Sequence, residues 1–188
     1  NKKSERKIIM SIAVISYSMT GNNQALAKSV AQKISAEHII VTEDKPRSNG
    51  TIIGDLLLGK TPKVRPEPAA LKKYDAVILA GPVWIGKVAT PLRAYLRYLK
   101  KEKSRYAFVS ISGGALGPNP KLGGELTKRT GRQPDALVDL HIADLMPGDA
   151  KAERKNTSAY RLTAEDVEKL TDAAVSNLGK LTAGAGLS

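Results

Sequence analysis

Apolar residues recur along this chain in two patterns, continuous runs and stripes with helical spacing. Continuous runs occupy residues 12–15, 38–41, 76–80 and 106–111. Runs of this length predict strands, and the run at 76–80 is typical of one that a parallel sheet buries on both faces. Residues 136–143 alternate between apolar and polar instead, which predicts a half-exposed strand at a sheet edge.

Stretches with helical spacing lie between these predicted strands. Apolar residues spaced four apart over 26–34 predict a helix that begins near residue 22 or 23. Further helices are expected over 91–99 and 121–130, and the last begins at 163–166 with the pattern of a capping box. The residues of the last helix expected to face inward are Val167, Leu170, Ala174, Leu178 and Leu181. Strands that alternate with helices in this way predict an α/β fold with a doubly wound sheet.

Two connections are longer than the rest. Residues 42–73 are rich in proline and basic residues, and a short helix is expected within them at 51–58. The string GDLLLGKT at 54–61 matches the nucleoside-triphosphate loop formula. That formula needs a buried strand before it and a helix after it, whereas Pro62 follows at once, so we interpret the match as a coincidence. Residues 146–162 are a basic loop long enough to be a lid.

The most informative stretch is the turn between the first run and the first helix. Ser18, Thr20, Gly21, Asn22 and Asn23 place two hydroxyls, a glycine and two amides where the helix begins. The unpaired N–H groups of a helix start and such side chains converge on one point, which favours phosphate binding. An ordinary helix N-cap at Thr20 or Asn22 is the alternative.

The string S-x-T-G-N at 18–22, placed after an N-terminal apolar strand, resembles the phosphate loop of flavodoxin-like proteins, which hold the monophosphate of FMN. The resemblance implies an FMN cofactor whose phosphate lies on residues 18–23. Asn23 departs from the family pattern, which usually has threonine there. An amide still donates a hydrogen bond, so Asn23 bears on how tightly FMN binds more than on whether this is a phosphate loop.

A second loop follows the apolar run at 76–80. The string GPVWIGKVATPLRAYL at 81–96 closely resembles the second flavin loop of flavodoxin-like proteins and flavin-dependent quinone reductases. In those proteins the loop lies along the isoalloxazine ring. The residues that the resemblance assigns to this lining are Pro82, Val83, Trp84, Ile85 and Gly86. The alternative is that Trp84 is simply part of the core. The flavin role is favoured because α/β sheets bind ligands at loops that follow the ends of strands.

A third loop, Ser112, Gly113 and Gly114, follows the run at 106–111 and resembles the third flavin loop of the same family. The resemblance implies that the two glycines let the backbone approach the ring edge. A glycine-rich turn without a ligand is the alternative. Electron-carrying flavodoxins place a tyrosine hereabouts over the outer flavin face, and residues 111–145 contain none. An open flavin face would suit a substrate or a nicotinamide.

The three loops follow the first, third and fourth predicted strands, so they are expected to meet at one edge of the sheet. We therefore predict a flavodoxin-like, doubly wound five-stranded parallel sheet of order 2-1-3-4-5. One domain is expected over 11–181, with a basic tail at 1–10 and a second tail at 182–188. The start of the chain has no cleavage-like site of a signal peptide.

The resemblance implies an FMN-binding oxidoreductase that takes electrons from NAD(P)H and reduces quinones or similar small acceptors. An electron carrier of the flavodoxin type, which docks on redox proteins, ranks second because such carriers tend to be acidic and to cover the flavin with tyrosine. A flavodoxin-fold protein that has lost flavin and binds anionic partners is a third alternative. No side chain is identified as a catalytic acid or base. Lys87 is either a cation that stabilises reduced flavin or a plain surface lysine.

Composition refines this picture. Lys and Arg number 30 against 18 Asp and Glu, a net charge of +12, which suits anionic partners in general. The basic residues are scattered, those at 93–105 are expected on a solvated helix face, and only 4% of residues are aromatic, so nucleic-acid binding is disfavoured. No run approaches the roughly 18 apolar residues of a membrane span.

Cysteine is absent, which excludes disulfides and thiolate metal sites and fits a cytoplasmic protein. The two histidines, His38 and His141, are interpreted as strand residues, so no metal site is expected. Dimers often complete the site in reductases of this superfamily, which leaves a homodimer open.

Overall fold

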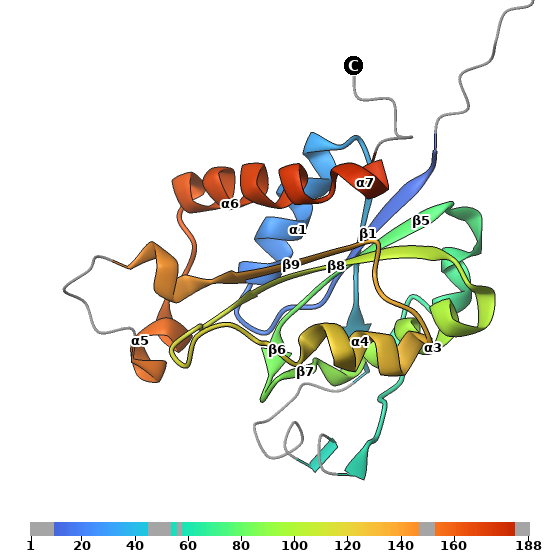
Figure 1. Cartoon of the computed structure of the whole chain (residues 1–188), viewed down its shortest axis with the longest axis horizontal. Helices are drawn as coiled ribbons and strands as arrows, with labels where there is room; N and C mark the ends of the chain where they lie inside the picture. The colour runs from blue at the N-terminus through green and yellow to red at the C-terminus, as the bar shows by residue number, and fades with distance from the viewer. Residues whose placement is uncertain (1–9, 45–53, 56–57, 147–152, 183–188) are drawn as a thin grey trace, which may run out of the picture.

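A computed structural model describes residues 10–44, 54–55, 58–146 and 153–182. Five parallel strands form one sheet in the order β2-β1-β5-β8-β9, which confirms the predicted order 2-1-3-4-5 (Figure 1). The strands are β1 (Ile12–Ser16), β2 (Glu37–Ile40), β5 (Ala76–Ala80), β8 (Arg105–Ser112) and β9 (Ala136–His141).

The central strands are apolar throughout because both of their faces are covered. In β1 the side chains of Ile12 and Val14 join the core on one face, and those of Ala13 and Ile15 join the core on the other. The edge strand β9 alternates as predicted at Leu137, which is 38% exposed, and Val138, which is buried, but not at its end, where His141 is buried and Leu140 only partly so. It ends two residues earlier than expected, because Ile142–Leu145 forms the 3-10 helix η3.

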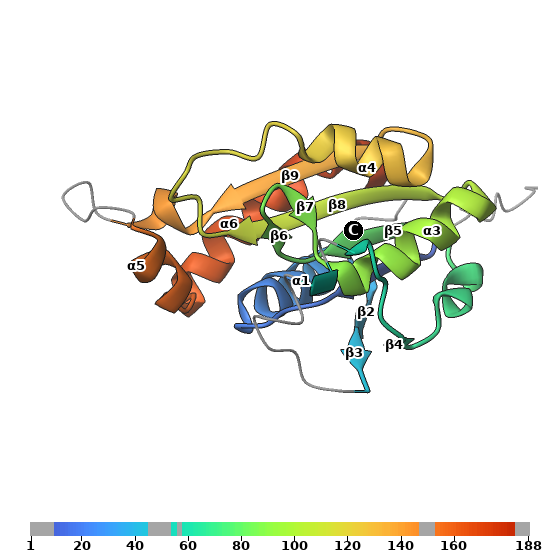
Figure 2. The same ribbon diagram turned by 90° about the horizontal axis from the view of Figure 1, so that it is seen from below.

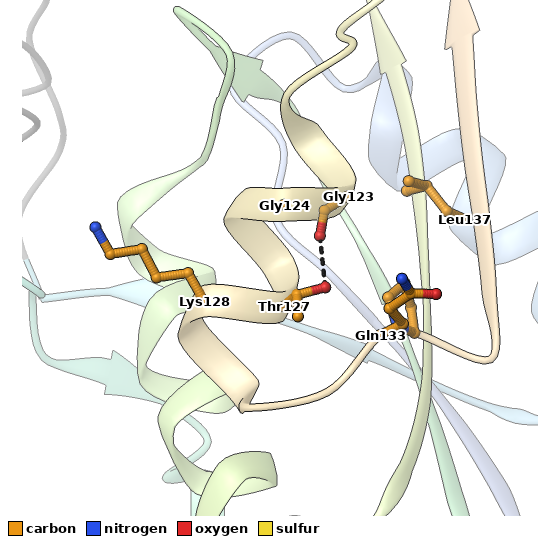
Figure 3. A pocket seen from close by; sticks show the side chains of 7 residues that line it. Gly123, Gly124, Thr127, Lys128, Gln133 and Leu137 are labelled. Carbon is orange, nitrogen blue, oxygen red and sulfur yellow. Dashed lines mark hydrogen bonds between the residues drawn. The ribbon is translucent and has the colours of Figure 1, made fainter.

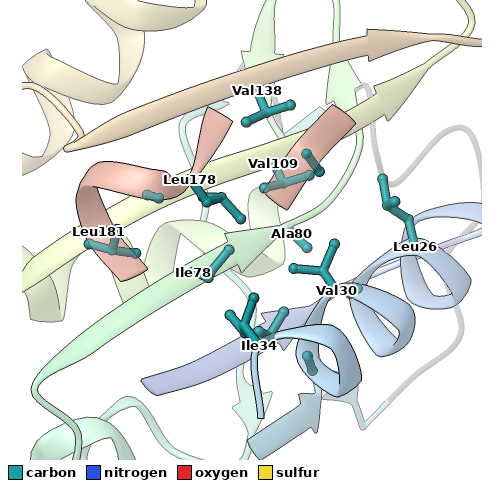
Figure 4. Close-up of a cluster of buried hydrophobic side chains, with 14 of the residues drawn as sticks. Leu26, Val30, Ile34, Ile78, Ala80, Val109, Val138, Leu178 and Leu181 are labelled. Atoms are coloured by element: carbon teal, nitrogen blue, oxygen red, sulfur yellow. The ribbon is translucent and has the colours of Figure 1, made fainter. Parts of the chain in front are cut away.

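Helices cover both faces of the sheet (Figures 1 and 2). α1 (Asn22–Lys33), α6 (Ala164–Asn177) and α7 (Gly179–Thr182) pack on one face, where Leu26, Val30 and Leu178 meet β5, β8 and β9 (Figure 4). η2 (Thr90–Leu92), α3 (Arg93–Glu102) and α4 (Leu122–Thr130) pack on the other.

The predicted helix ends are largely confirmed. Thr163 and Asp166 form the capping box that begins α6, and Gly131 ends α4 with a φ of 78°. Two expectations are wrong. Arg93 is 3% exposed, not solvated, because it lies three residues before the buried Leu96 on the same helix face. Thr182, expected in the tail, is buried at the end of α7, where its hydroxyl donates to the Leu178 carbonyl.

The connection over 42–73 contains structure that the sequence did not indicate. β3 (Thr42–Glu43) pairs antiparallel with β4 (Val64–Arg65), and η1 (Pro68–Lys73) follows. Of the helix expected at 51–58, only residues 54–55 and 58 are described, and they are helical; the other residues lie outside the described part. Residues 60–63 are not helical and lead into β4, so the helix that a nucleoside-triphosphate loop requires does not follow the 54–61 string.

The predicted tails lie mainly outside the described residues, at 1–9 and 183–188. Across residues 10–44, 54–55, 58–146 and 153–182 there is no cluster of three or more acidic, histidine or cysteine side chains that would hold a metal ion. Among the described helices, none has the length and apolarity needed to cross a membrane.

Candidate functional site

The three predicted loops leave the carboxyl ends of β1, β5 and β8, which are adjacent strands of the sheet. The chain order changes direction between β1 and β5, because β2 lies on one side of β1 and β5 lies on the other. In doubly wound sheets, ligands bind outside the carboxyl edge at such a switch point. The three loops therefore surround the position where this fold class holds a ligand.

The first loop offers backbone N–H groups at the start of α1. Gly21 has a φ of 90°, and its N–H donates to the Ser18 hydroxyl at 3.0 Å. The first bond within the helix joins the Ala25 N–H to the Gly21 carbonyl at 2.9 Å, so the N–H groups of residues 22–24 face the helix end. Thr20 is exposed, and no atom lies within 4 Å of a Cβ built on Gly21. The loop is open to an anion.

The two asparagine side chains of this loop are engaged within the protein. Asn23 is 4% exposed; its amide donates to the Ile111 carbonyl at 2.9 Å and accepts from the Ile111 N–H at 3.0 Å. The Asn22 amide donates to the Tyr160 carbonyl at 3.0 Å and accepts from the Leu162 N–H at 3.2 Å. The phosphate contact expected from the Asn23 amide is thus replaced by a tie between α1 and β8. What both residues still present at the helix end is their backbone N–H.

The second loop is a tight hairpin, β6 (Val83–Trp84) and β7 (Lys87–Val88), which the sequence did not indicate. Its turn residues Ile85 and Gly86 have φ values of 50° and 69°, as in a type I′ turn. A β-branched residue is strained at positive φ, and Ile85 is 78% exposed, so burial does not explain its place. This strained backbone conformation places the apolar Ile85 side chain at the exposed tip of the hairpin.

Trp84 is half-buried and joins the core without being enclosed by it. Its ring meets Tyr17 edge-on at 6.0 Å between centroids and an angle of 83°. It also packs on the core cluster that contains Leu92 and Leu96. The core alternative is therefore correct for part of the Trp84 side chain, and the rest of it is accessible to solvent.

The third loop is packed against the protein's own side chains. A Cβ on Gly113 would lie 2.8 Å from the Thr157 hydroxyl, and one on Gly114 would lie 2.4 Å from the His141 Cβ. The close approach of Thr157 and His141 therefore requires glycine at both positions. From the sequence, glycine was expected here to let a flavin ring approach the backbone. The Gly113 carbonyl also accepts from the Ala143 N–H at 3.1 Å, which fixes the loop beside the end of β9.

A polar network that sequence reasoning missed supports this loop. His141 was expected on the more polar side of β9, but it is 8% exposed. Its Nε2 lies 3.3 Å from an Asp139 carboxylate oxygen and its Nδ1 3.6 Å from one of Asp144. Asn119 donates to Asp139 from its backbone at 3.0 Å and from its amide at 3.1 Å. Partly buried hydrogen bonds thus tie the β8–α4 connection to β9, and no motif in the sequence indicates them.

The basic loop expected at 146–162 contains a helix, α5 (Arg154–Ala159), and residues 147–152 lie outside the described part. Thr157 of α5 is 2% exposed because it packs on Gly113. Beyond α5, the Tyr160 hydroxyl donates to Asp166 at 2.8 Å, and this bond, with burial, raises the Tyr160 pKa. Burial favours a higher Asp166 pKa, but hydrogen bonds from Thr163 and Tyr160 outweigh it and lower that pKa.

An open hollow of about 650 Å³ lies elsewhere, between α4 and the edge strand β9 (Figure 3). Its lining residues are Gly123, Gly124, Thr127, Lys128, Gln133, Pro134 and Leu137. None of them belongs to the three loops, so we do not assign the candidate site to this hollow.

Comparison with known proteins rests on structure. No protein-family model matches the chain, and no curated protein matches it. A flavoprotein from Lactobacillus acidophilus NCFM, solved in complex with FMN, superposes with a TM-score of 0.54 at 17% identity over 70% of this chain and 92% of that one. The fold is flavodoxin-like.

Two further solved structures agree with this flavodoxin-like fold. The apo-form of the Lactobacillus acidophilus flavoprotein has a TM-score of 0.58 at 16% identity, over 73% of this chain and 96% of that one. A flavodoxin from the domain Archaea has a TM-score of 0.53 at 13% identity, over 92% of this chain and 99% of that one. At such identities the likeness establishes the architecture, and the chemistry has to be argued from the residues of the three loops.

Proposed function

We propose that this flavodoxin-like chain binds FMN at its three loops and acts as an NAD(P)H-dependent oxidoreductase for quinones or similar small acceptors. The observation that carries the proposal is the meeting of the 18–23, 82–86 and 112–114 loops at the switch point between β1 and β5. A solved neighbour of the same fold was crystallised with FMN, which supports the choice of flavin. The absence of cysteine accords with a cytoplasmic location, which is part of the proposal.

The phosphate of FMN would be held by the first loop. Ser18 and Thr20 supply hydroxyls, and the N–H groups of residues 22–24 supply donors at the positive end of the α1 dipole. Gly21 leaves room for the anion because no atom lies near its absent side chain. Asn22 and Asn23 contribute backbone donors and hold the loop in place through their side chains.

The ring would lie between the second and third loops, on Pro82 to Gly86 and on Ser112 to Gly114. FMN supplies the hydride and electron chemistry when bound, and the chain binds and orients it. Trp84 and Ile85 offer apolar surface, and the 112–114 backbone is held in position by Thr157 and His141. We assign no acid or base, and Lys87 is an exposed cation on the hairpin beside this position.

The reductase is favoured over an electron carrier by two features. Residues 111–145 contain no tyrosine that would cover the outer flavin face, and the net charge of +12 is opposite to that of typical flavodoxin carriers. A carrier that docks on a redox partner protein is the second candidate, since the exposed apolar residues Met19 and Ile85 lie on the first and second loops and Leu116 follows the third.

One experiment separates these candidates. The protein is reconstituted with FMN, its visible spectrum is recorded, and NADPH and then NADH are added without oxygen. Bleaching of bound flavin within seconds is the expected result. Bound flavin that neither nucleotide reduces would make the carrier the better candidate, and a protein that leaves the flavin spectrum and fluorescence unchanged would contradict the cofactor assignment.

A further inference from the structure

A chain of hydrogen-bonded side chains leads from β9 to the hydroxyl group of Ser112 in the third loop. Ser112 ends β8 and is in register with His141 of β9. Ser110 is in register with Asp139 in the same way. Residues in register on neighbouring strands, and residues two apart on one strand, share a face of the sheet, so Ser112 and Asp139 do. Asn119, in the connection before α4, bonds to both of their side chains.

Asp139 fixes the orientation of the Asn119 side chain. Asn119 donates to the Asp139 carboxylate from its backbone N–H at 3.0 Å and from its Nδ2 at 3.1 Å. A carboxylate only accepts hydrogen bonds, so the amide has to turn its NH2 group toward Asp139. The Asn119 carbonyl accepts from the Leu122 N–H at 3.0 Å, which holds its backbone at the start of α4. Asn119 is therefore held at three atoms.

This orientation decides what the Ser112 hydroxyl can do. The second hydrogen of the Asn119 NH2 group is available to Ser112, whose Oγ lies 3.5 Å from Nδ2. A hydroxyl that accepts a hydrogen bond still has its own hydrogen to donate. Among the described residues, no acceptor for that hydrogen is found. Ser112 is half-buried at the loop assigned to the ring edge, so a ligand there can provide the acceptor.

We propose that Ser112 donates a hydrogen bond to the polar edge of the isoalloxazine ring, and that Asn119 and Asp139 are positioning residues that keep its hydroxyl a donor. The inference rests on the proposed function, because it requires FMN at the three loops. The carbonyl oxygens and N1 of that edge gain negative charge when flavin is reduced. A donor placed there binds reduced FMN more tightly than oxidised FMN and so raises the midpoint potential of the bound flavin.

The test is a double-mutant cycle on Ser112 and Asp139, with every protein reconstituted with FMN. Dithionite titration without oxygen, followed in the visible spectrum, gives the midpoint potential and hence the ratio of the two Kd values, for oxidised and for reduced FMN. Ser112→Ala should lower the preference for reduced FMN about tenfold, as for the loss of a hydrogen bond to a charged acceptor. Asp139→Asn should lower it less, because an amide no longer forces the NH2 group of Asn119 toward it.

The second arm of the cycle separates positioning from a structural role. In the Ser112→Ala background, Asp139→Asn should have no further effect, because Asp139 acts through the hydroxyl that is already absent. Asp144→Asn is the matched control, since Asp144 is a 76% exposed carboxylate 3.6 Å from His141 that does not bond to Asn119. Removal of a negative charge by itself favours reduced, anionic flavin, so Asp144→Asn should not lower the preference.

Each other result overturns the inference. An unchanged preference in Ser112→Ala would remove Ser112 as a donor to the ring. Equal effects of Asp139→Asn in both backgrounds would make Asp139 a structural residue, and an equal fall in Asp144→Asn would assign the effect to charge. If NADPH and NADH fail to reduce the flavin, the proposed reductase fails while the dithionite titration still decides the inference. A protein that does not bind FMN would overturn both.

Discussion

At the scale of single residues, Gly114 of the third loop and Gly117, three residues after it, allow the cost of a positive φ to be compared with the cost of a steric clash. Gly114 and Gly117 have φ values of 71° and 81°, which other residues adopt with difficulty. Only Gly114 also faces a side chain, since its Cβ would lie 2.4 Å from that of His141, whereas nothing lies within 4 Å at Gly117. The close approach of His141 is therefore the reason for glycine at 114.

We predict that Gly114→Ala lowers the free energy of unfolding by about 3 kcal/mol, through backbone strain and the clash with His141 together. Gly117→Ala should cost about 1 kcal/mol, through strain alone. Urea unfolding followed by circular dichroism measures both. Equal losses would show that His141 moves aside freely and that the third loop is not fixed by it.

His38 links the stability of the fold to pH. Its ring lies 2.8 Å from the Ser16 hydroxyl, and burial, with the positive charge of Lys28, lowers its pKa from 6.5. A lowered pKa means that His38 binds the proton more readily in the unfolded chain than in the folded one. The contribution of His38 to the free energy of unfolding is therefore fully present above pH 6.5, its pKa in the unfolded chain, and decreases as the pH falls below 6.5 toward its pKa in the folded protein.

We predict that the urea midpoint of the wild type falls between about pH 7.5 and about pH 5.5, the range in which histidine titrates. His38→Gln keeps a hydrogen-bonding side chain without the titration, and its midpoint should fall less over the same range. Parallel curves for the two proteins would assign the pH dependence to other groups.

At the scale of elements, the start of α1 is tied to two segments far along the chain. Asn23 pairs with both backbone groups of Ile111 at the end of β8, and Asn22 pairs with the segment before α6. The helix N-terminus that would receive the phosphate is thereby held against the third loop. These ties couple the phosphate end of the site to its ring end.

Asn23→Ala should lower the free energy of unfolding by about 3 kcal/mol, because it leaves the buried N–H and carbonyl of Ile111 without partners. Gln24→Ala, in the same turn at a half-exposed position, should change it by less than about 0.5 kcal/mol. Chemical denaturation of both variants provides the comparison. A small loss for Asn23→Ala would mean that water replaces the amide at no cost.

At the scale of the whole molecule, ligand binding at loops from three strands should stabilise the fold as a unit. A ligand at about 100 times its Kd adds about 2.7 kcal/mol to the free energy of unfolding. We predict that FMN stabilises the protein and that riboflavin, which lacks the phosphate, stabilises it less at the same concentration. Thermal unfolding with each ligand measures the difference.

Thr20→Leu should remove the advantage of FMN over riboflavin, since the exposed Thr20 hydroxyl is assigned to the phosphate. Thr20→Ser, which retains the hydroxyl, serves as the control and should keep that advantage. A Thr20→Leu protein that still prefers FMN would remove Thr20 from the phosphate site.

The sequence by itself determined the strands of the sheet and predicted the place of the candidate site. Apolar runs, the alternation over 136–143 and helical stripes are local patterns that follow from burial on one or two faces, so they predicted five strands and the loops after them. The predicted strand order rested in addition on the loop strings and their resemblance to flavodoxin-like proteins. The S-x-T-G-N string and the loop glycines indicated a flavodoxin-like fold, and they too are local signals, because the conformation of a turn depends on neighbouring residues.

Only the tertiary structure decided what those loop residues contact. The engagement of Asn22 and Asn23, the close approach of Thr157 and His141 to Gly113 and Gly114, and the tie between Asn119 and Asp139 join positions that are remote or unpatterned in sequence. The pairing of β3 with β4 and the docking of α5 are likewise long-range. Such contacts depend on how helices, strands and loops pack against one another, and the periodicity of apolar residues along the chain does not predict which side chains will then meet.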